Sequence, residues 1–109
     1  MNVGKSGALG EMIATMYFLE AGYEVFQNCT PNGPADLTVW NKESNVTVLV
    51  DVKHQRVGYK KKDGSISFAK KESFLRDDNV WVLVVNQGQI QIPPAFFYEL
   101  NGIRNKDQN

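Results

Sequence analysis

The stretch VTVLVDVKHQ, residues 46–55, decides the fold because it is typical of a long strand at the centre of a sheet. Successive side chains of a strand point to opposite faces. One face consists of valines and a histidine: Val46, Val48, Val50, Val52 and His54. The other begins apolar and ends charged or polar: Thr47, Leu49, Asp51, Lys53 and Gln55. A carboxylate and an ammonium group at the end of a buried strand cost desolvation that structure alone rarely requires, so the stretch predicts a central strand that ends in a functional site.

A helix is predicted before this strand, over residues 7–21. Its apolar residues recur at three- and four-residue steps, which indicates an amphipathic helix. We expect this apolar stripe to face the core: Leu9, Met12, Ile13, Met16 and Leu19. Ser6 is the expected N-cap, and Gly22 is expected to end the helix in a left-handed conformation.

The remaining elements alternate between strands and short helices. We expect strands over residues 23–27, 36–40, 80–86 and 89–92, and turns over residues 32–34 and 41–45. A hairpin over residues 60–68, turning at Asp63-Gly64, a helix over 69–77 and a helical turn over 95–100 complete the set, with 101–109 as a frayed tail. This order predicts an α/β sandwich built on a mixed sheet, in which Trp40 and Trp81 belong to the core.

The length and composition describe one globular domain. The 109 residues, 42% of them apolar and 22% charged, suffice for a core without disulfides. No run approaches the ~18–20 apolar residues of a membrane span, and no secretory signal precedes the first helix. Cys29 is the single cysteine and His54 the single histidine, which excludes a zinc finger and predicts a free thiol in a reducing compartment. The expected location is intracellular, either the cytoplasm or, for a phage-encoded protein, the host cytoplasm.

The net charge of zero conceals a basic middle third. Residues 51–76 carry eight basic and three acidic side chains, whereas the flanking parts are acidic. Such a segment is a candidate footprint for a polyanion, although a solvated lysine-rich hairpin explains it equally well. The expected phosphate contacts are Lys5, Arg56, Lys60, Lys61, Lys62, Lys70 and Lys71.

Two aspartates are the candidate metal ligands. If strands 36–40 and 46–55 pair as a hairpin, Asp36 lies near Asp51, and two such carboxylates repel unless a cation sits between them. Mg²⁺ suits this arrangement, because it takes oxygen ligands and is usually held by one or two carboxylates plus substrate phosphate. The alternatives are an Asp36 that caps a turn and an Asp51 that forms a structural ion pair with Lys53.

Three further residues are assigned roles around this pair. Lys53 can stabilise charge on the phosphoryl oxygens or assist an attacking water, and Gln55 can orient the water or a phosphate oxygen. Glu11, in the first helix, can complete the ligand set, although a solvated helix residue is the simpler reading of Glu11 alone.

The same residues resemble a known family, the PD-(D/E)XK nuclease superfamily. Four elements in order carry the resemblance: Gly10-Glu11, Gly22-Tyr23-Glu24-Val25, Pro34-Ala35-Asp36 and Asp51-Val52-Lys53. Ala35 separates the proline from the motif aspartate, and the strand carboxylate is aspartate rather than glutamate, so both acids are still supplied. The resemblance covers about residues 4–57, and the later strand fits more loosely.

The resemblance implies a restriction-endonuclease-like core, a mixed central sheet flanked by helices in a single domain over residues 1–109. It implies metal ligands at Asp36 and Asp51, a supporting acid at Glu11, a catalytic Lys53 and a functional polar residue at Gln55. The cofactor is then Mg²⁺, for which Mn²⁺ can substitute, and the enzyme is a homodimer. Archaeal-type Holliday junction resolvases and small intron-associated or phage homing endonucleases are the most similar members. The segment Phe96-Phe97-Tyr98 is the candidate interface.

The leading hypothesis is a metal-dependent DNA endonuclease that hydrolyses phosphodiester bonds, selective for branched, Holliday-junction-type DNA or for a short site. One alternative is a sequence-specific homing or restriction-like endonuclease. Another is a catalytically inert nucleic-acid-binding module of the same fold, and a third is a structural α/β domain with a surface Asp51–Lys53 pair. No residue distinguishes branched from linear DNA, or DNA from RNA.

Overall fold

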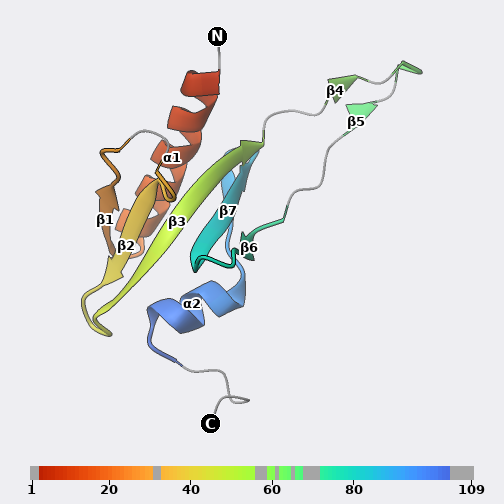
Figure 1. Cartoon of the computed structure of the whole chain (residues 1–109). Helices are drawn as coiled ribbons and strands as arrows, with labels where there is room; N and C mark the ends of the chain where they lie inside the picture. The colour runs from red at the N-terminus through yellow and green to blue at the C-terminus, as the bar shows by residue number, and fades with distance from the viewer. Residues whose placement is uncertain are drawn as a thin grey trace.

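The computed structural model describes residues 3–30, 33–55, 59–60, 62–64, 66–67 and 72–103. Six of its strands form one sheet in the order β1-β2-β3-β7-β6, with β8 also paired to β7 (Figure 1). Their bounds are β1 Glu24–Gln27, β2 Leu37–Asn41, β3 Val46–Gln55, β6 Phe74–Leu75, β7 Val80–Asn86 and β8 Gln89–Gln91. The predicted bounds of β3 and β7 are confirmed, those of β1 and β8 differ by one residue at one end, and those of β2 are shifted by one residue at both ends.

The sheet is mixed, as predicted. Strands β1, β2 and β3 form an antiparallel meander, whereas β3 and β7 pair in parallel, with Asp51 opposite Val82 and Lys53 opposite Val84. Strands β6 and β8 pair antiparallel with the first and second halves of β7. Strand β3, with β2 on one side and β7 on the other, is therefore central.

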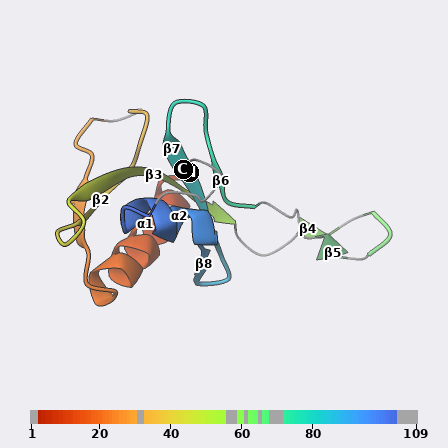
Figure 2. The same cartoon turned by 90° about the horizontal axis from the view of Figure 1, so that it is seen from below.

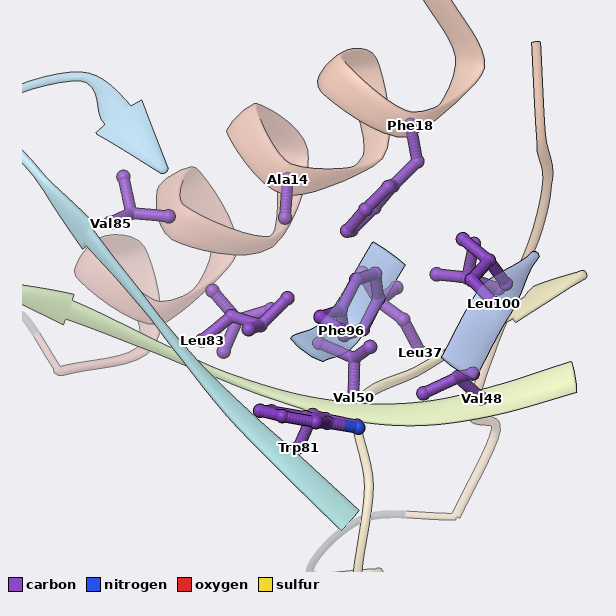
Figure 3. Packing of buried hydrophobic residues seen from close by; sticks show 12 residues of the cluster. Ala14, Phe18, Leu37, Val48, Val50, Trp81, Leu83, Val85, Phe96 and Leu100 are labelled. Atoms are coloured by element: carbon purple, nitrogen blue, oxygen red, sulfur yellow. The ribbon is translucent and has the colours of Figure 1, made fainter. Parts of the chain in front are cut away.

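Two helices pack on the valine face of β3, as Figures 2 and 3 show. These are α1, Val3–Glu20, and α2, Pro94–Leu100. The ring of Phe96 lies 5.5 Å from that of Phe18 and 5.6 Å from that of Trp81, so both helices and the sheet share one core. Each such fully buried apolar side chain contributes roughly 1.5–3 kcal/mol. Neither described helix covers the opposite sheet face, which carries Asp51 and Lys53.

The end of α1 is the one predicted, but its start is not. Gly22 has φ +95° and donates its N–H to the carbonyl of Leu19, while the Tyr23 N–H reaches the carbonyl of Phe18. These two bonds form a Schellman motif, which satisfies carbonyls that the helix leaves free. The expected N-cap at Ser6 is wrong, because the chain is already helical from Val3.

The predicted core stripe of α1 is also wrong. Among the helix residues whose side chains are described, 7–20, the buried ones are Gly10, Ala14 and Phe18, with Ile13 partly buried beside them. The remaining residues of the predicted stripe are about half exposed on the opposite side of the helix: Leu9, Met12, Met16 and Leu19. Both sides of α1 carry apolar residues, and the side with the small residues packs on the sheet because it lets the backbones approach closely.

The predicted helix over residues 69–77 is not formed in its described part. Residues 72–73 are irregular, Phe74 and Leu75 form β6, and a turn follows. The Ser73 hydroxyl explains the difference, because it accepts the Val84 N–H at 2.9 Å and donates to the carbonyl of Gln91 at 2.6 Å. These bonds dock the segment on the edge of β7, which competes with helix formation.

Of the remaining expectations, the hairpin and the burial of Trp81 are confirmed, a core position for Trp40 is confirmed only in part, and fraying of residues 101–103 is wrong, while residues 104–109 of the predicted tail lie outside the described part. The hairpin forms from β4, Tyr59–Lys60, and β5, Ile66–Ser67, and projects from the main sheet in both views (Figures 1 and 2). Trp81 is buried, whereas Trp40 is only partly buried. Residues 101–103 are not frayed, since Asn101, Gly102 and Ile103 donate their N–H groups to carbonyls of α2. No helix among the described residues is long and apolar enough to cross a membrane.

Gly10 allows α1 to approach β3, and we expect Gly10→Ala to destabilise the protein. An added Cβ would lie 2.8 Å from the Cβ of His54, which cannot swing away as the tip of a long side chain can. Overpacking of this kind costs about 1–3 kcal/mol, partly offset by a helix-propensity gain of about 1 kcal/mol. Urea denaturation measures the net loss in free energy of unfolding.

Gly7→Ala is the matched control, because nothing lies within 4 Å of its added Cβ. This variant should gain up to about 1 kcal/mol of stability from helix propensity. Equal effects of the two substitutions would contradict the close approach at Gly10.

Candidate active site

Asp36 is fixed against β3 by its backbone and its side chain. Its N–H donates to the carbonyl of Val50 at 2.8 Å, and its Oδ2 accepts the N–H of Val52 at 2.7 Å. The residue therefore extends the β2–β3 pairing beyond Leu37 and lies beside Asp51, as the hairpin argument predicted. The hydrogen bond from the Val52 N–H joins Asp36 to the neighbouring strand β3. A residue that only capped its own turn would not need this bond.

Asn28 supports the loop that precedes Asp36, a role that no sequence pattern indicated. Its Nδ2 donates to the carbonyl of Ala35 at 2.7 Å, and its own N–H donates to the carbonyl of Asp36 at 2.9 Å. A Cβ on Gly33 would clash with the Asn28 amide nitrogen, so the glycine makes room for this side chain. Only the tertiary fold reveals the contact, because an asparagine in a polar loop carries no distinguishing pattern.

Asp51 and Lys53 lie on the uncovered sheet face, as their alternation predicted. The Nζ of Lys53 is 3.2 Å from Oδ2 of Asp51, and the Asp51 side chain is 14% exposed against 56% for Lys53. The ion pair of the structural alternative is thus present. Its geometry keeps the ammonium group accessible from solvent while the carboxylate is largely enclosed.

Three carboxyl groups converge at this end of β3. Burial, a hydrogen bond with the Asp51 carboxylate, and the charges of Asp51 and Glu11 raise the pKa of Asp36 to about 6, although its bond to the Val52 N–H acts in the opposite direction. Burial first, and then the charge of Asp51, raise the pKa of Glu11 above its usual range. The fold therefore places Asp36 and Asp51 in contact, with Glu11 close enough for its charge to act on both of them.

The donor set fits a hard divalent cation. All three groups offer carboxylate oxygens, and their mutual repulsion is what a cation relieves. Among the described residues, no three His, Cys, Asp or Glu side chains form a group that could hold a metal ion, so Glu11 does not complete a direct ligand set with Asp36 and Asp51. The pair Asp36 and Asp51 alone matches the usual Mg²⁺ pattern, in which one or two carboxylates bind the ion and water and phosphate complete its shell.

Arg76 is a further residue of the site that the sequence did not single out. Its Nη1 lies 3.5 Å from Oδ2 of Asp51, and its Nε donates to Oδ1 of Asp78 at 3.1 Å, with a second bond from Nη2 to the same carboxylate. These hydrogen bonds raise the pKa of Arg76 and lower that of Asp78. Two cationic groups, those of Lys53 and Arg76, therefore approach Asp51. No pattern in the neighbouring sequence predicts that Arg76 lies beside Asp51, because the residue reaches this position through the pairing of β6 with β7.

The remaining predicted site residues are only partly described. Gln55 is 9% exposed at the end of β3, on the strand face of Asp51. Of the expected phosphate contacts, Lys62 is exposed in the turn of the β4–β5 hairpin. Lys5 and Lys60 lie in α1 and β4, but their side chains are outside the described part. Also outside it are Arg56, Lys61, Lys70 and Lys71.

Two further expectations concern surface residues. Cys29 is exposed and forms no disulfide, as predicted. The candidate interface at Phe96-Phe97-Tyr98 is largely wrong, because Phe96 is fully buried and Phe97 packs against the core. Tyr98 alone is exposed, so the segment is chiefly the means by which α2 covers the sheet.

The raised pKa of Asp36 predicts a pH-dependent effect of Asp36→Asn on stability in the absence of metal. A carboxyl with a raised pKa stabilises the fold while protonated, and this contribution is lost as pH rises from about 4 through about 6. The asparagine oxygen can still accept the Val52 N–H and carries no charge. We expect Asp36→Asn to gain stability relative to the wild type between pH 4 and pH 7, by about 1 kcal/mol after allowance for solvent screening.

Chemical denaturation in EDTA across this pH range measures the difference. Glu43→Gln, at an exposed carboxylate in the β2–β3 turn, is the control and should show no such trend. A pH-independent difference between Asp36→Asn and the wild type would contradict the assigned shift.

Comparison with known proteins supports the fold. No protein-family model and no curated protein matches the sequence. The structure is similar to the solved structure of a bacterial homing endonuclease, I-Ssp6803I, with a TM-score of 0.58 and 13% sequence identity. The similarity covers 80% of this chain and 64% of the endonuclease chain, so this chain spans less than two thirds of the length of that endonuclease. The chain has a nuclease-like mixed α/β fold, and the similarity does not single out the PD-(D/E)XK superfamily.

Proposed function

We propose that the protein is a metal-dependent DNA endonuclease that hydrolyses phosphodiester bonds. The observation that carries this proposal is the contact of Asp36 with Asp51 at one end of β3, where burial first, then a hydrogen bond with Asp51 and the charges of Asp51 and Glu11, raise the pKa of Asp36 to about 6. The likeness of the fold to that of a homing endonuclease supports the same class. A structural domain gains nothing from two acids held together in this way.

The proposed cofactor is Mg²⁺, with Mn²⁺ as a substitute, held by Asp36 and Asp51 with Glu11 as a supporting acid. When bound, the ion supplies Lewis acidity, which acidifies a water and neutralises charge on the phosphoryl oxygens. Asp36 must lose its proton to act as a ligand, so we expect activity to rise with pH through about 6. The Val52 N–H, 2.7 Å from Oδ2 of Asp36, holds this carboxylate in a fixed orientation.

Hydrolysis joins a water oxygen to phosphorus and breaks one phosphorus–oxygen ester bond, and the leaving oxygen gains a proton. Negative charge accumulates on the phosphoryl oxygens along this path, where fixed cations stabilise it. The exposed ammonium group of Lys53 is free to turn from Asp51 towards a bound phosphate. Arg76 can bind a phosphate with its guanidinium while its bonds to Asp78 keep it positioned.

Two kinds of substrate remain candidates. The first is branched DNA of the Holliday-junction type or a short site, which suits a small chain with a basic hairpin. The second is a sequence-specific site of the homing or restriction type, which the fold of the structural neighbour favours. Both are cut by the same chemistry, and the cleavage assay below separates them.

The proposed enzyme is a homodimer, because one site per chain cuts one strand and a two-fold axis supplies the second site. The apolar stripe on the outer side of α1 supports a second copy as the partner. Met12 and Met16 are each 58% exposed, and Leu9 and Leu19 extend the stripe to on the order of 400 Å² per chain. A hollow of about 460 Å³ beside it, lined partly by Met16 and Ile90, can receive a side chain. The two copies would bury about 800–1,200 Å², which is the range of weak or transient interfaces rather than of tight ones.

The proposed function predicts magnesium-dependent cleavage of DNA that requires Asp51. Labelled four-way junction and matched linear duplex are incubated with Mg²⁺ or EDTA. Asp51→Asn and Asp36→Asn should each lower the cleavage rate by at least about 10²-fold, because each removes a ligand or fixed charge used in the transition state. Glu43→Gln, which changes a remote exposed carboxylate, should retain full activity.

The outcome also separates the candidates. Cleavage of the junction alone establishes a structure-selective enzyme, and cleavage of duplex at one site in a random-sequence library establishes a sequence-specific one. Binding of DNA without cleavage of either substrate would refute the enzyme and favour an inert module. Activity that survives in Asp51→Asn would refute the assignment of the site.

The dimer predicts a loss of self-association in Met12→Glu/Met16→Glu. Two carboxylates at the centre of the apolar stripe repel their copies across the two-fold axis and cannot be desolvated cheaply. Sedimentation equilibrium should give a dimer for the wild type and a monomer for this variant, with unchanged far-UV circular dichroism. Tyr98→Glu, an exposed site on α2, is the control and should leave the dimer intact. The opposite pattern would return the interface to α2.

A further inference from the structure

A hollow of about 400 Å³ lies on the uncovered sheet face next to the carboxylates. Strands β3, β7 and β6 form it, and these strands lie side by side in Figure 1. Its floor is made by Val82 and Val84 of β7, both almost fully buried. Asp51, one of the acids of the proposed function, thus lines a recess with an apolar floor, which phosphate hydrolysis itself does not use.

Because of the sheet register, charged side chains line one side of this hollow and an aromatic side chain lines the other. Val82 is opposite Asp51 of β3 and also opposite Phe74 of β6, so the three residues form one row across the sheet and share a face. Two strand spacings, about 10 Å, separate Asp51 from Phe74 along this row. The charged side and the aromatic side therefore line the same hollow and can contact one bound molecule at the same time.

The charged side carries two cations. Lys53 and Arg76 both line the hollow, with Nζ and Nη1 at 3.2 and 3.5 Å from Oδ2 of Asp51. Arg76 also has Asp78 as a fixed partner, which keeps its guanidinium in place when Asp51 is engaged elsewhere. A phosphate bound near Asp51 therefore meets two positive groups at the edge of the recess.

The other side offers an aromatic ring to solvent. Phe74 is 52% exposed, whereas Phe18 and Phe96 of the core are fully buried. A half-exposed ring beside cationic groups is the arrangement with which proteins bind unpaired nucleotides, because a base stacks on the ring while its phosphate contacts the cations. A base inside a duplex is covered by its neighbours and cannot make this contact.

We propose that this hollow binds one unstacked nucleotide, with its base against Phe74 and its adjoining phosphate at Lys53 and Arg76. The inference rests on the proposed function for the identity of the polymer, and it narrows the substrate to DNA with an unpaired nucleotide next to the cleaved bond. Glu72 also lines the hollow, and its carboxylate is placed to accept a hydrogen bond from an exocyclic amino group while it disfavours a second phosphate.

Leu75 provides the matched control for Phe74. It is the neighbouring residue in β6 and is 44% exposed, but it pairs with Trp81 and therefore belongs to the opposite face of the sheet. Truncation of either side chain removes a half-exposed apolar group from the same short strand. Only truncation of Phe74 affects the proposed contact.

The test measures DNA binding without metal, by fluorescence anisotropy of labelled single-stranded oligonucleotide and of matched blunt duplex in EDTA. Phe74→Ala should weaken single-strand binding about tenfold, in line with the loss of one stacked base, and Leu75→Ala less than twofold. Duplex binding should change less than twofold in both variants. Equal losses for the two variants, or no loss in Phe74→Ala, would overturn the inference.

A second pair of variants tests whether a loss of binding in Phe74→Ala reflects the missing ring or a loss of folding. Phe74→Leu keeps an apolar side chain but removes the ring, and Phe74→Trp keeps a larger ring. Single-strand affinity should fall in Phe74→Leu and should be retained or increased in Phe74→Trp, with thermal unfolding recorded for each. Equal affinities of these two variants would show that the ring does not stack on a base.

The readouts distinguish this inference from the proposed function. Single-strand binding that depends on Phe74, without cleavage in Mg²⁺, would refute the enzyme and leave a nucleotide-binding module. Cleavage that depends on Asp51 and is equal for paired and unpaired substrates, with no effect of Phe74→Ala on affinity, would refute the nucleotide site and leave the enzyme.

Discussion

The parallel pairing of β3 with β7 is the constraint on which the rest of the structure depends. It places Asp51 opposite Val82 and Lys53 opposite Val84, so the charged end of β3 lies in the interior of the sheet. Strand β2 then brings Asp36 from one side, and β6, beyond β7, brings Arg76 from the other. A slip of one residue would turn Asp51 towards the helices and bury a carboxylate against Phe18 and Phe96, at a cost of several kcal/mol. The valine face thus specifies the register, and the register assembles the site.

The packing of α1 on this sheet supplies the third acid. Gly10 has no side chain to separate the helix from His54 and Val52, and Glu11 follows it directly. The close approach therefore brings the Glu11 carboxylate within range of Asp51, which contributes to its raised pKa. The same helix carries apolar residues on its far side, where no described element covers them. One helix thus packs on the sheet through Gly10, Ala14 and Phe18 and leaves other apolar residues exposed on its far side.

The sequence predicted the fold correctly where a pattern of neighbouring residues was compatible with only one secondary structure. The valine alternation of residues 46–55, the apolar run of residues 80–86 and the glycine after α1 each predicted an element that the structure contains. The apolar stripe of α1 was misassigned because periodicity shows that a helix has faces and not which of two apolar faces meets the sheet. The segment at residues 72–77 was misassigned because its conformation is set by bonds from Ser73 to β7 and β8, which are distant in the sequence.

The candidate site was predictable to a similar extent and for similar reasons. Asp36 and Asp51 were found because a hairpin brings them together and because buried acids are unusual. Asn28 and Arg76 were not, since each acts through a contact that only the tertiary fold creates. Phe74 was assigned to a helix, where its relation to Asp51 does not exist. Site residues can thus be predicted from sequence when burying them costs free energy, as for a carboxylate in a central strand. They cannot be predicted when only the tertiary fold brings them to the site.

The electrostatics of the cluster show how such a site is tolerated in a folded protein. Lys53 and Arg76 both approach Asp51, whereas the bonds recorded for the Asp36 carboxyl are those to the Val52 N–H and to Asp51. Burial and the neighbouring carboxylates together raise the pKa of Asp36 to about 6, so a proton on Asp36 relieves the remaining repulsion below that pH. In the proposed enzyme, a divalent cation held by the two acids would replace this proton and would compete with the two basic side chains for Asp51. Lys53 and Arg76 would then be available to a phosphate, so the groups that stabilise the metal-free fold would also be those that bind the substrate.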